Sequence, residues 1–311
     1  MEEAEAAIKR LSDTLEAGAE LAKKDREYAA VAREEKKRIA VINRLIAKRK
    51  VALAAGDARE KLDEVVSAAR SKLEAAKQPQ ATDAAIQDAA QAVQSVEQTL
   101  TAGASLEEQD RGYAARAAKA REELLALQDE LAFARQAHAL RQRLLGALSA
   151  GEAASRSAAT ERDLRAQKAL YEKAAAQFGS CESSGADALQ ESPALAGTAI
   201  VVGGRQSSPK DVIGMCAERS KATKLLLGKV EGLISFEEGP KRAFELGKSL
   251  LSKGKKPEAL QQFLECVGSG RILQNQNPEL KDLQFEVAGG KMTLAQLVEQ
   301  CTKHRDALQP R

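Results

Sequence analysis

The sequence predicts a mainly α-helical protein: a long antiparallel helical rod or coiled coil, followed by two tandem helical modules that each carry a short β element. Aromatic residues make up only 3% of the 311 residues, and Ala and Leu dominate the 43% that are hydrophobic. Another 30% of the residues are charged, which is the composition of long helices. Residues 2–54 contain no proline and are rich in strong helix formers.

Residues 1–178 are expected to form an antiparallel bundle of long helices, because short loops join helices that fold back on each other. The expected helices span residues 2–54, 58–77, 84–148 and 152–178. The expected turns are Ala55-Gly56-Asp57, Gln78-Pro79-Gln80 and Ala150-Gly151, with a bend at Gly103.

Residues 179–311 have a different composition, with dense Gly, Ser and Pro at 179–209. We expect a loop there that carries one strand at 199–202, closed by Gly203-Gly204. Helices are expected at 210–233, 240–253, 257–267 and 294–308, with a second strand and turn at 283–293.

The sequence contains an internal repeat with a period of about 85 residues. Residues 14–21 and 25–30 match residues 99–106 and 110–115, which places Tyr28 on Tyr113. Residues 174–181 match 259–266, which places Phe178 on Phe263. We expect these four aromatic residues to anchor helix packing, and we expect the C-terminal modules to span about 174–235 and 259–311.

The four cysteines form two pairs of equivalents in this alignment. Cys181 and Cys216 are separated by the same 35 residues as Cys266 and Cys301. The spacing favours one disulfide within each module, each worth roughly 3 to 4 kcal/mol by loop closure. Pairing between modules, four buried thiols and a zinc site are the alternatives, although the sequence has no Cys-x-x-Cys.

Residues 243–260 (AFELGKSLLSKGKKPEAL) carry a Leu-Gly pair, a turn glycine and then Glu-Ala-Leu. Within about 240–267 the sequence thus resembles a tetratricopeptide helix pair. The resemblance implies packing of that type and binding to proteins. A strand-bearing insert follows where the next such repeat would begin.

Three other patterns have a structural and a chemical interpretation. Residues 33–50 hold eight Lys and Arg against two Glu, which we interpret as a solvated helix face rather than a nucleic-acid or lipid patch. Gly203-Gly204 favours a β-turn over an anion nest. His304 follows Cys301 by three residues and could activate a thiolate only if that cysteine were reduced.

These patterns predict a non-enzymatic scaffolding or partner-docking protein of a cell-envelope or secreted assembly. Its partners would be other proteins, including itself through the long helices; nucleic acid, metals and cofactors are not expected. The net charge of +3 and the lack of an 18-residue apolar run indicate neither nucleic acid nor a membrane span. Disulfides imply the periplasm or the extracellular space. The alternative is a cytoplasmic coiled-coil adaptor with reduced cysteines.

Overall fold

The computed structural model describes residues 2–309. Helices account for 86% of it, so the protein is mainly α, as predicted. The chain divides into two compact units, residues 1–137 and 138–311. The division falls inside helix α6 (Arg111–Thr160) rather than near residue 178.

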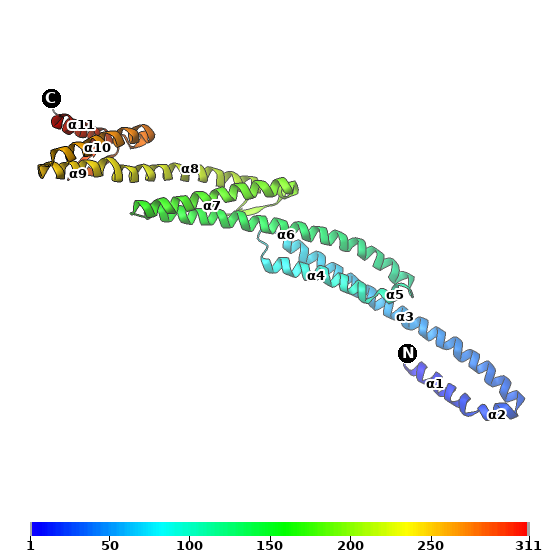
Figure 1. The fold of residues 1–311 in the computed structure, drawn as a ribbon. Helices are drawn as coiled ribbons and strands as arrows, with labels where there is room; N and C mark the ends of the chain where they lie inside the picture. Colours follow the sequence, from blue (N-terminus) through cyan, green and yellow to red (C-terminus); the bar gives the residue numbers. More distant parts are fainter. Residues whose placement is uncertain (1, 310–311) are drawn as a thin grey trace. The chain divides into compact units, whose positions relative to one another are not determined.

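The first unit consists of helices that fold back on one another (Figure 1). They are α1 (Glu2–Ala17), α2 (Ala19–Lys24), α3 (Arg26–Lys77), α4 (Asp83–Ala102), α5 (Ala104–Glu107) and the first part of α6. The core of this unit begins at Ala55, where residues 55–76 of α3 pack against α4 and against residues 113–134 of α6. Buried α3 residues recur at spacings of four and three, which places them on one helical face: Leu62, Val66, Ala69 and Leu73.

The turn expected at residues 55–57 is wrong, because α3 runs unbroken through these residues. Ala55 is fully buried in the core, and a continuous helix keeps it in register with the buried residues that follow. The single helix expected over residues 2–54 is wrong as well. It breaks at Gly18 and again at Asp25, whose Oδ1 accepts hydrogen bonds from the backbone N–H groups of Glu27 and Tyr28 and so caps α3.

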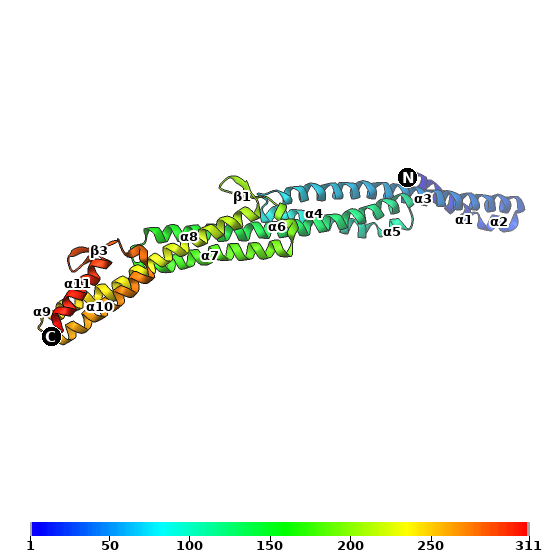
Figure 2. The ribbon, with the colours of Figure 1, turned by 90° about the horizontal axis from the view of Figure 1, so that it is seen from above.

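The second unit begins with the rest of α6 and contains two helix-hairpin-helix segments. The first segment is α7 (Leu164–Glu191), η1 (Pro193–Gly197), β1 (Ile200–Val202), β2 (Arg205–Ser207) and α8 (Pro209–Phe236). A π-helical turn, η2 (Glu237–Lys241), leads to α9 (Arg242–Ser252). The second segment is α10 (Lys256–Gln276), η3 (Pro278–Leu280), β3 (Gln284–Val287), β4 (Gly290–Thr293) and α11 (Leu294–Leu308). Figure 2 shows both hairpins beside their helices.

Several expected helix ends in this unit are wrong. Helix α10, which was expected to end at residue 267, continues to Gln276. The turn at Ala150-Gly151 is absent, since α6 continues to Thr160 and Gly151 is buried under the ring of Phe178. A Cβ at Gly151 would lie 2.6 Å from Cε1 of that ring, so this glycine permits close helix packing. Helix α7 also continues beyond Phe178 to Glu191, which makes residues 179–191 helical rather than part of a loop.

Each hairpin has the same register and the same turn. Val202 pairs with Arg205 in the first, and Val287 pairs with Gly290 in the second. Both central turn residues have positive φ in each hairpin, which is typical of a type I′ turn: Gly203 57°, Gly204 81°, Ala288 49° and Gly289 80°. The first hairpin therefore contains a second strand, residues 205–207, where only one strand was expected.

The helix after each hairpin begins in the same way. Ser208 caps α8 in a capping box with Asp211, and Thr293 caps α11 in a capping box with Gln296. The same order of elements, with the same cap, thus occurs twice in the second unit.

Candidate functional site

Two disulfides join the helices that flank the hairpins. Cys181 of α7 is bonded to Cys216 of α8, and Cys266 of α10 is bonded to Cys301 of α11, each across 35 residues. All four cysteines are fully buried. A glycine lies one turn beyond the first cysteine of each pair, Gly185 and Gly270, and a Cβ on either would lie within 2.6 Å of the facing Ile213 or Val298. The four cysteines therefore lie where two pairs of helices approach closely.

Two of the aromatic residues expected to be anchors lie beside these bonds. Phe178 is 1% exposed and lies over Gly151, and Phe263 is fully buried and lies over Gly247 of α9. His304 stacks on Phe263 with ring centroids 4.8 Å apart. Burial lowers the pKa of His304, and the nearby Lys248 lowers it further. Because Cys301 is oxidised, His304 has no thiol there to activate.

The other two aromatic residues, Tyr28 and Tyr113, lie against glycines that end helices. A Cβ at Gly18 would lie 1.8 Å from Oη of Tyr28, and a Cβ at Gly103 would lie 1.7 Å from Oη of Tyr113. Asp110 caps α6 by accepting a hydrogen bond from the backbone N–H of Tyr113, as Asp25 does for Tyr28. The first unit thus contains two helical corners with the same geometry. The first corner lies at Gly18 and Tyr28, and the second corner lies at Gly103 and Tyr113. Burial raises the pKa of Tyr113.

The second corner packs on residues 55–77 of α3, which we call the covering helix. Three ion pairs connect the covering helix to α6: Arg116 to Asp63 at 2.5 Å, Glu123 to Arg70 at 3.3 Å, and Glu130 to Lys77. In each pair the α6 residue comes 53 positions after its partner in the covering helix. The covering helix therefore runs parallel to α6, with one ion pair in every heptad.

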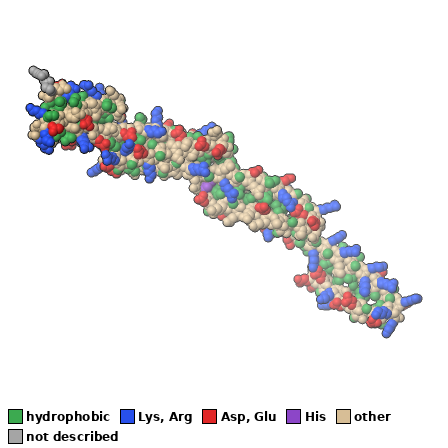
Figure 3. All heavy atoms as spheres, viewed as in Figure 1, with side chains coloured by type: hydrophobic (Ala, Val, Ile, Leu, Met, Phe, Trp, Pro, Cys, Tyr) green, Lys and Arg blue, Asp and Glu red, His purple; other side chains and the backbone are tan. Residues whose placement is uncertain are grey.

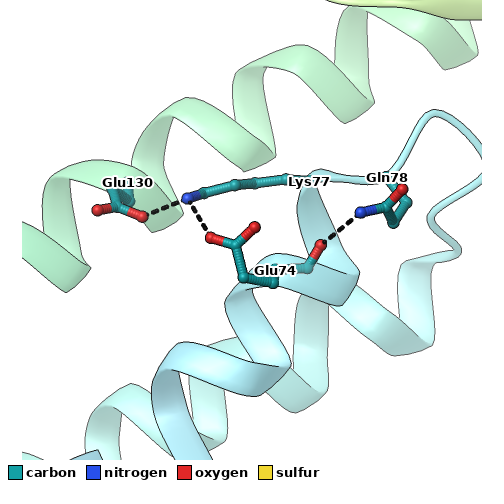
Figure 4. A network of polar contacts seen from close by, with 4 residues as sticks. All are labelled: Glu74, Lys77, Gln78 and Glu130. Atoms are coloured by element: carbon teal, nitrogen blue, oxygen red, sulfur yellow. Dashed lines mark hydrogen bonds and ion pairs between the residues drawn. The ribbon is translucent and has the colours of Figure 1, made fainter. Parts of the chain in front are cut away.

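Figure 4 shows the last of these ion pairs. The ammonium of Lys77 lies between the carboxylates of Glu130 and Glu74, and the Gln78 side chain donates to the Glu74 carbonyl oxygen at the end of α3. The hydrogen bond to Glu130, followed by that to Glu74, raises the pKa of Lys77. This network fixes the register of the covering helix at its C-terminal end.

Among the described residues, 2–309, no helix covers the first corner in this way. This corner belongs to residues 2–54, which we call the arm: α1 and α2 fold back along the first part of α3. Helix α1 has no buried residue, and α3 buries only Ala32 and Ile39 within the arm. Large apolar side chains remain exposed among Lys and Arg side chains at this end of the first unit (Figure 3): Leu11, Leu21, Val31, Val41, Ile42, Leu45 and Leu53.

The covering helix buries apolar residues of the second corner that correspond to exposed residues of the arm. Leu11 is 47% exposed and Ile42 is 42% exposed, whereas the residues 85 positions later, Val96 and Leu127, are 0% and 4% exposed. The counterparts are buried in the core that contains the covering helix. The same helical faces are therefore apolar in both corners but covered in only one.

The remaining expected features lie at exposed positions. In the basic run, Lys37 pairs with Glu34, Arg38 pairs with Glu35 at 2.7 Å, and Lys50 pairs with Glu5 of α1. Gly203 and Gly204 form the two-residue turn described above.

Within residues 2–309, no cluster of three His, Cys, Asp or Glu side chains is placed to hold a metal ion. No helix in the described part of the chain combines the length and apolarity needed to span a membrane.

Comparison of the chain with protein-family models, with curated proteins and with solved structures finds no match in any of the three. The exposed face of the arm is the candidate binding site of the first unit. The second unit contains both disulfide bonds.

Proposed function

We propose that this chain is a non-enzymatic structural protein that docks a partner protein through its arm, within a cell-envelope or secreted assembly. The observation that carries the proposal is the apolar face of the arm, which stays exposed where its counterpart is buried. Contiguous exposed apolar surface is characteristic of protein interaction sites. Long helices also provide an extended binding surface, because each residue adds about 1.5 Å to the length of a helix.

The disulfides support an oxidising compartment, the periplasm or the extracellular space. Disulfides persist where thiols are not continuously reduced, and each bond here joins two helices across a hairpin. The alternative, a cytoplasmic adaptor with reduced cysteines, predicts four free thiols in protein isolated from its own cells.

The second unit provides a further protein-binding candidate in α9 and α10. These helices form an antiparallel pair in which Gly247 lies under Phe263, and Gly254 takes a φ of 75° in the turn between them. This arrangement supports the proposal of tetratricopeptide-like packing, with protein binding as its function.

Photo-cross-linking in the native cells tests the docking proposal. A benzoylphenylalanine residue replaces Leu45, which is 59% exposed on the apolar face of the arm. The control carries the same residue in place of Lys36, which is exposed on the opposite side of α3. We expect a discrete cross-linked product from position 45 and none from position 36. Equal cross-linking from both positions would overturn the proposal.

A further inference from the structure

The covering helix shows what kind of element fits a corner of this geometry. It is a single amphipathic helix that runs parallel to α6 and contacts both α4 and α6 of the second corner. Its apolar stripe buries the corner, and its charged residues meet Arg116, Glu123 and Glu130 of α6. The first corner has the same glycine, the same aspartate cap and the same tyrosine, so it offers the same geometry to an equivalent helix.

The arm residues at the positions equivalent to Arg116, Glu123 and Glu130 determine which side chains a helix that covers the first corner would need. In the alignment of the repeats, Arg116, Glu123 and Glu130 correspond to Val31, Arg38 and Leu45. Val31 and Leu45 are each 59% exposed. A helix in the same register therefore meets an apolar residue, a guanidinium and another apolar residue at intervals of seven.

We infer that the arm binds an acidic amphipathic helix of another protein, which runs parallel to α3 and places a carboxylate opposite Arg38 and apolar side chains opposite Val31 and Leu45. This inference rests on the proposed docking function and specifies its partner. On the same face, Arg38, Ile42, Leu45 and Arg49 follow one another at spacings of four, three and four. Two guanidinium groups thus flank the apolar pair, which favours an acidic partner.

A second copy of this chain is the less complementary occupant. Its own covering helix in this register would place Arg70 opposite Arg38, and like charges at such close range repel. Two arms paired about Ile42 and Leu45 would instead bring the basic run 33–50, with eight cations and two anions, against itself. Charge therefore selects a different protein.

Synthetic peptides test the inference on the full-length chain. One peptide has the natural sequence of residues 55–77, and the other carries Asp63→Leu, Arg70→Glu and Lys77→Leu, which match the arm. Titration calorimetry should show that the substituted peptide binds about tenfold more tightly, since two ionic side chains opposite apolar ones become apolar contacts. Equal affinity of the two peptides, or no binding of the substituted peptide, would overturn the inference.

A charge exchange tests the central contact. Arg38→Glu in the chain should weaken binding of the substituted peptide about threefold to fivefold, as expected for an exposed ion pair. It should strengthen binding of a third peptide that carries Asp63→Leu and Lys77→Leu but keeps Arg70. Lys36→Glu makes the same charge change on the opposite side of α3 and serves as the matched control. An identical response of both chain variants would show that the contact is not at Arg38.

The direction of the bound helix is measured by photo-cross-linking to the substituted peptide. A cross-linker at position 31 should label the peptide near its position 63, and a cross-linker at position 45 should label it near position 77. The reverse pattern would overturn the parallel arrangement. Light scattering of the chain alone completes the test, because a dimer that Leu45→Ser dissociates would identify a second copy as the occupant.

The two proposals fail in different ways. A cellular cross-link from position 45 to an antiparallel or basic helix would preserve the docking function and overturn the inference about its partner. A lack of any specific cellular cross-link would overturn the docking function itself, whatever the peptides do.

Discussion

Tyr113 lies so close to Gly103 that any side chain at position 103 would displace the tyrosine ring. A Cβ there would lie 1.7 Å from Oη of Tyr113 and 2.4 Å from Cζ. The ring is fully buried and cannot swing away without leaving the core of the first unit. Tyr28 and Gly18 have the same relationship in the arm. Each glycine therefore marks a corner where a helix ends and the chain turns back.

Gly103→Ala should destabilise the first unit by about 2 kcal/mol, because the added methyl group forces the buried ring out of place. Gly56→Ala is the matched control: Gly56 lies inside α3 with nothing within 4 Å of an added Cβ. This control should stabilise the protein by up to about 1 kcal/mol through helix propensity. Thermal unfolding measures both changes, and a loss of stability in Gly56→Ala would argue against a continuous α3.

Removing either disulfide should lower the free energy of unfolding by about 4 kcal/mol, given a closed loop of 35 residues. The variants replace Cys181 and Cys216, or Cys266 and Cys301, with alanine. Denaturant unfolding under oxidising conditions measures the loss. Adding a reductant should bring the natural chain down to the stability of a further variant in which all four cysteines are alanine, and an unchanged midpoint would contradict the loop-closure explanation.

Ala288 has a φ of 49°, a left-handed conformation that costs an L-residue about 1 to 2 kcal/mol. Its backbone N–H donates to Oε1 of Glu245 in α9 at 3.2 Å, which helps to hold the turn. Ala288→Gly should therefore raise the melting temperature of the second unit. The converse change at the equivalent position of the other hairpin, Gly203→Ala, should lower it. Shifts of the same sign would show that backbone strain is not the cause.

His304 should make the second unit less stable in mild acid. Because burial lowers its pKa, the unfolded chain binds a proton more readily than the folded chain does. The stabilising contribution is therefore complete above the unfolded value of about 6.5 and declines as the pH falls through the folded pKa. His304→Phe retains a ring against Phe263 and removes this titration. Melting temperatures between pH 7.5 and pH 5 should fall less in this variant, and identical profiles would contradict the assignment.

The sequence was informative wherever one residue type had one role. The pairing of the cysteines follows from their spacing, and a strand and turn were expected at residues 283–293, where the second hairpin lies. The turn glycines were ambiguous, because a glycine serves equally well to reverse the chain or to admit a neighbouring ring. Gly18 and Gly103 end helices, whereas Gly151 lies inside α6 beneath Phe178. An aromatic side chain of another helix packs on all three glycines, and this contact exists only in the folded chain.

The candidate docking face shows a second limit of the sequence. Leu11 and Val96 occupy equivalent, equally apolar positions, yet only Val96 is buried. Apolar periodicity identifies a face that needs covering and does not reveal which element covers it. In the structure, a buried apolar stripe and ion pairs between residues 53 apart join the covering helix to α6.

Peptide mapping of the natively isolated protein under non-reducing conditions is the most direct test of the proposal that this disulfide-linked protein belongs to an oxidising compartment. The predicted result is two cross-linked peptide pairs, one joining Cys181 to Cys216 and the other joining Cys266 to Cys301, with no free thiol. Four free thiols in protein alkylated at the moment of cell lysis would contradict it and would place the protein in a reducing compartment.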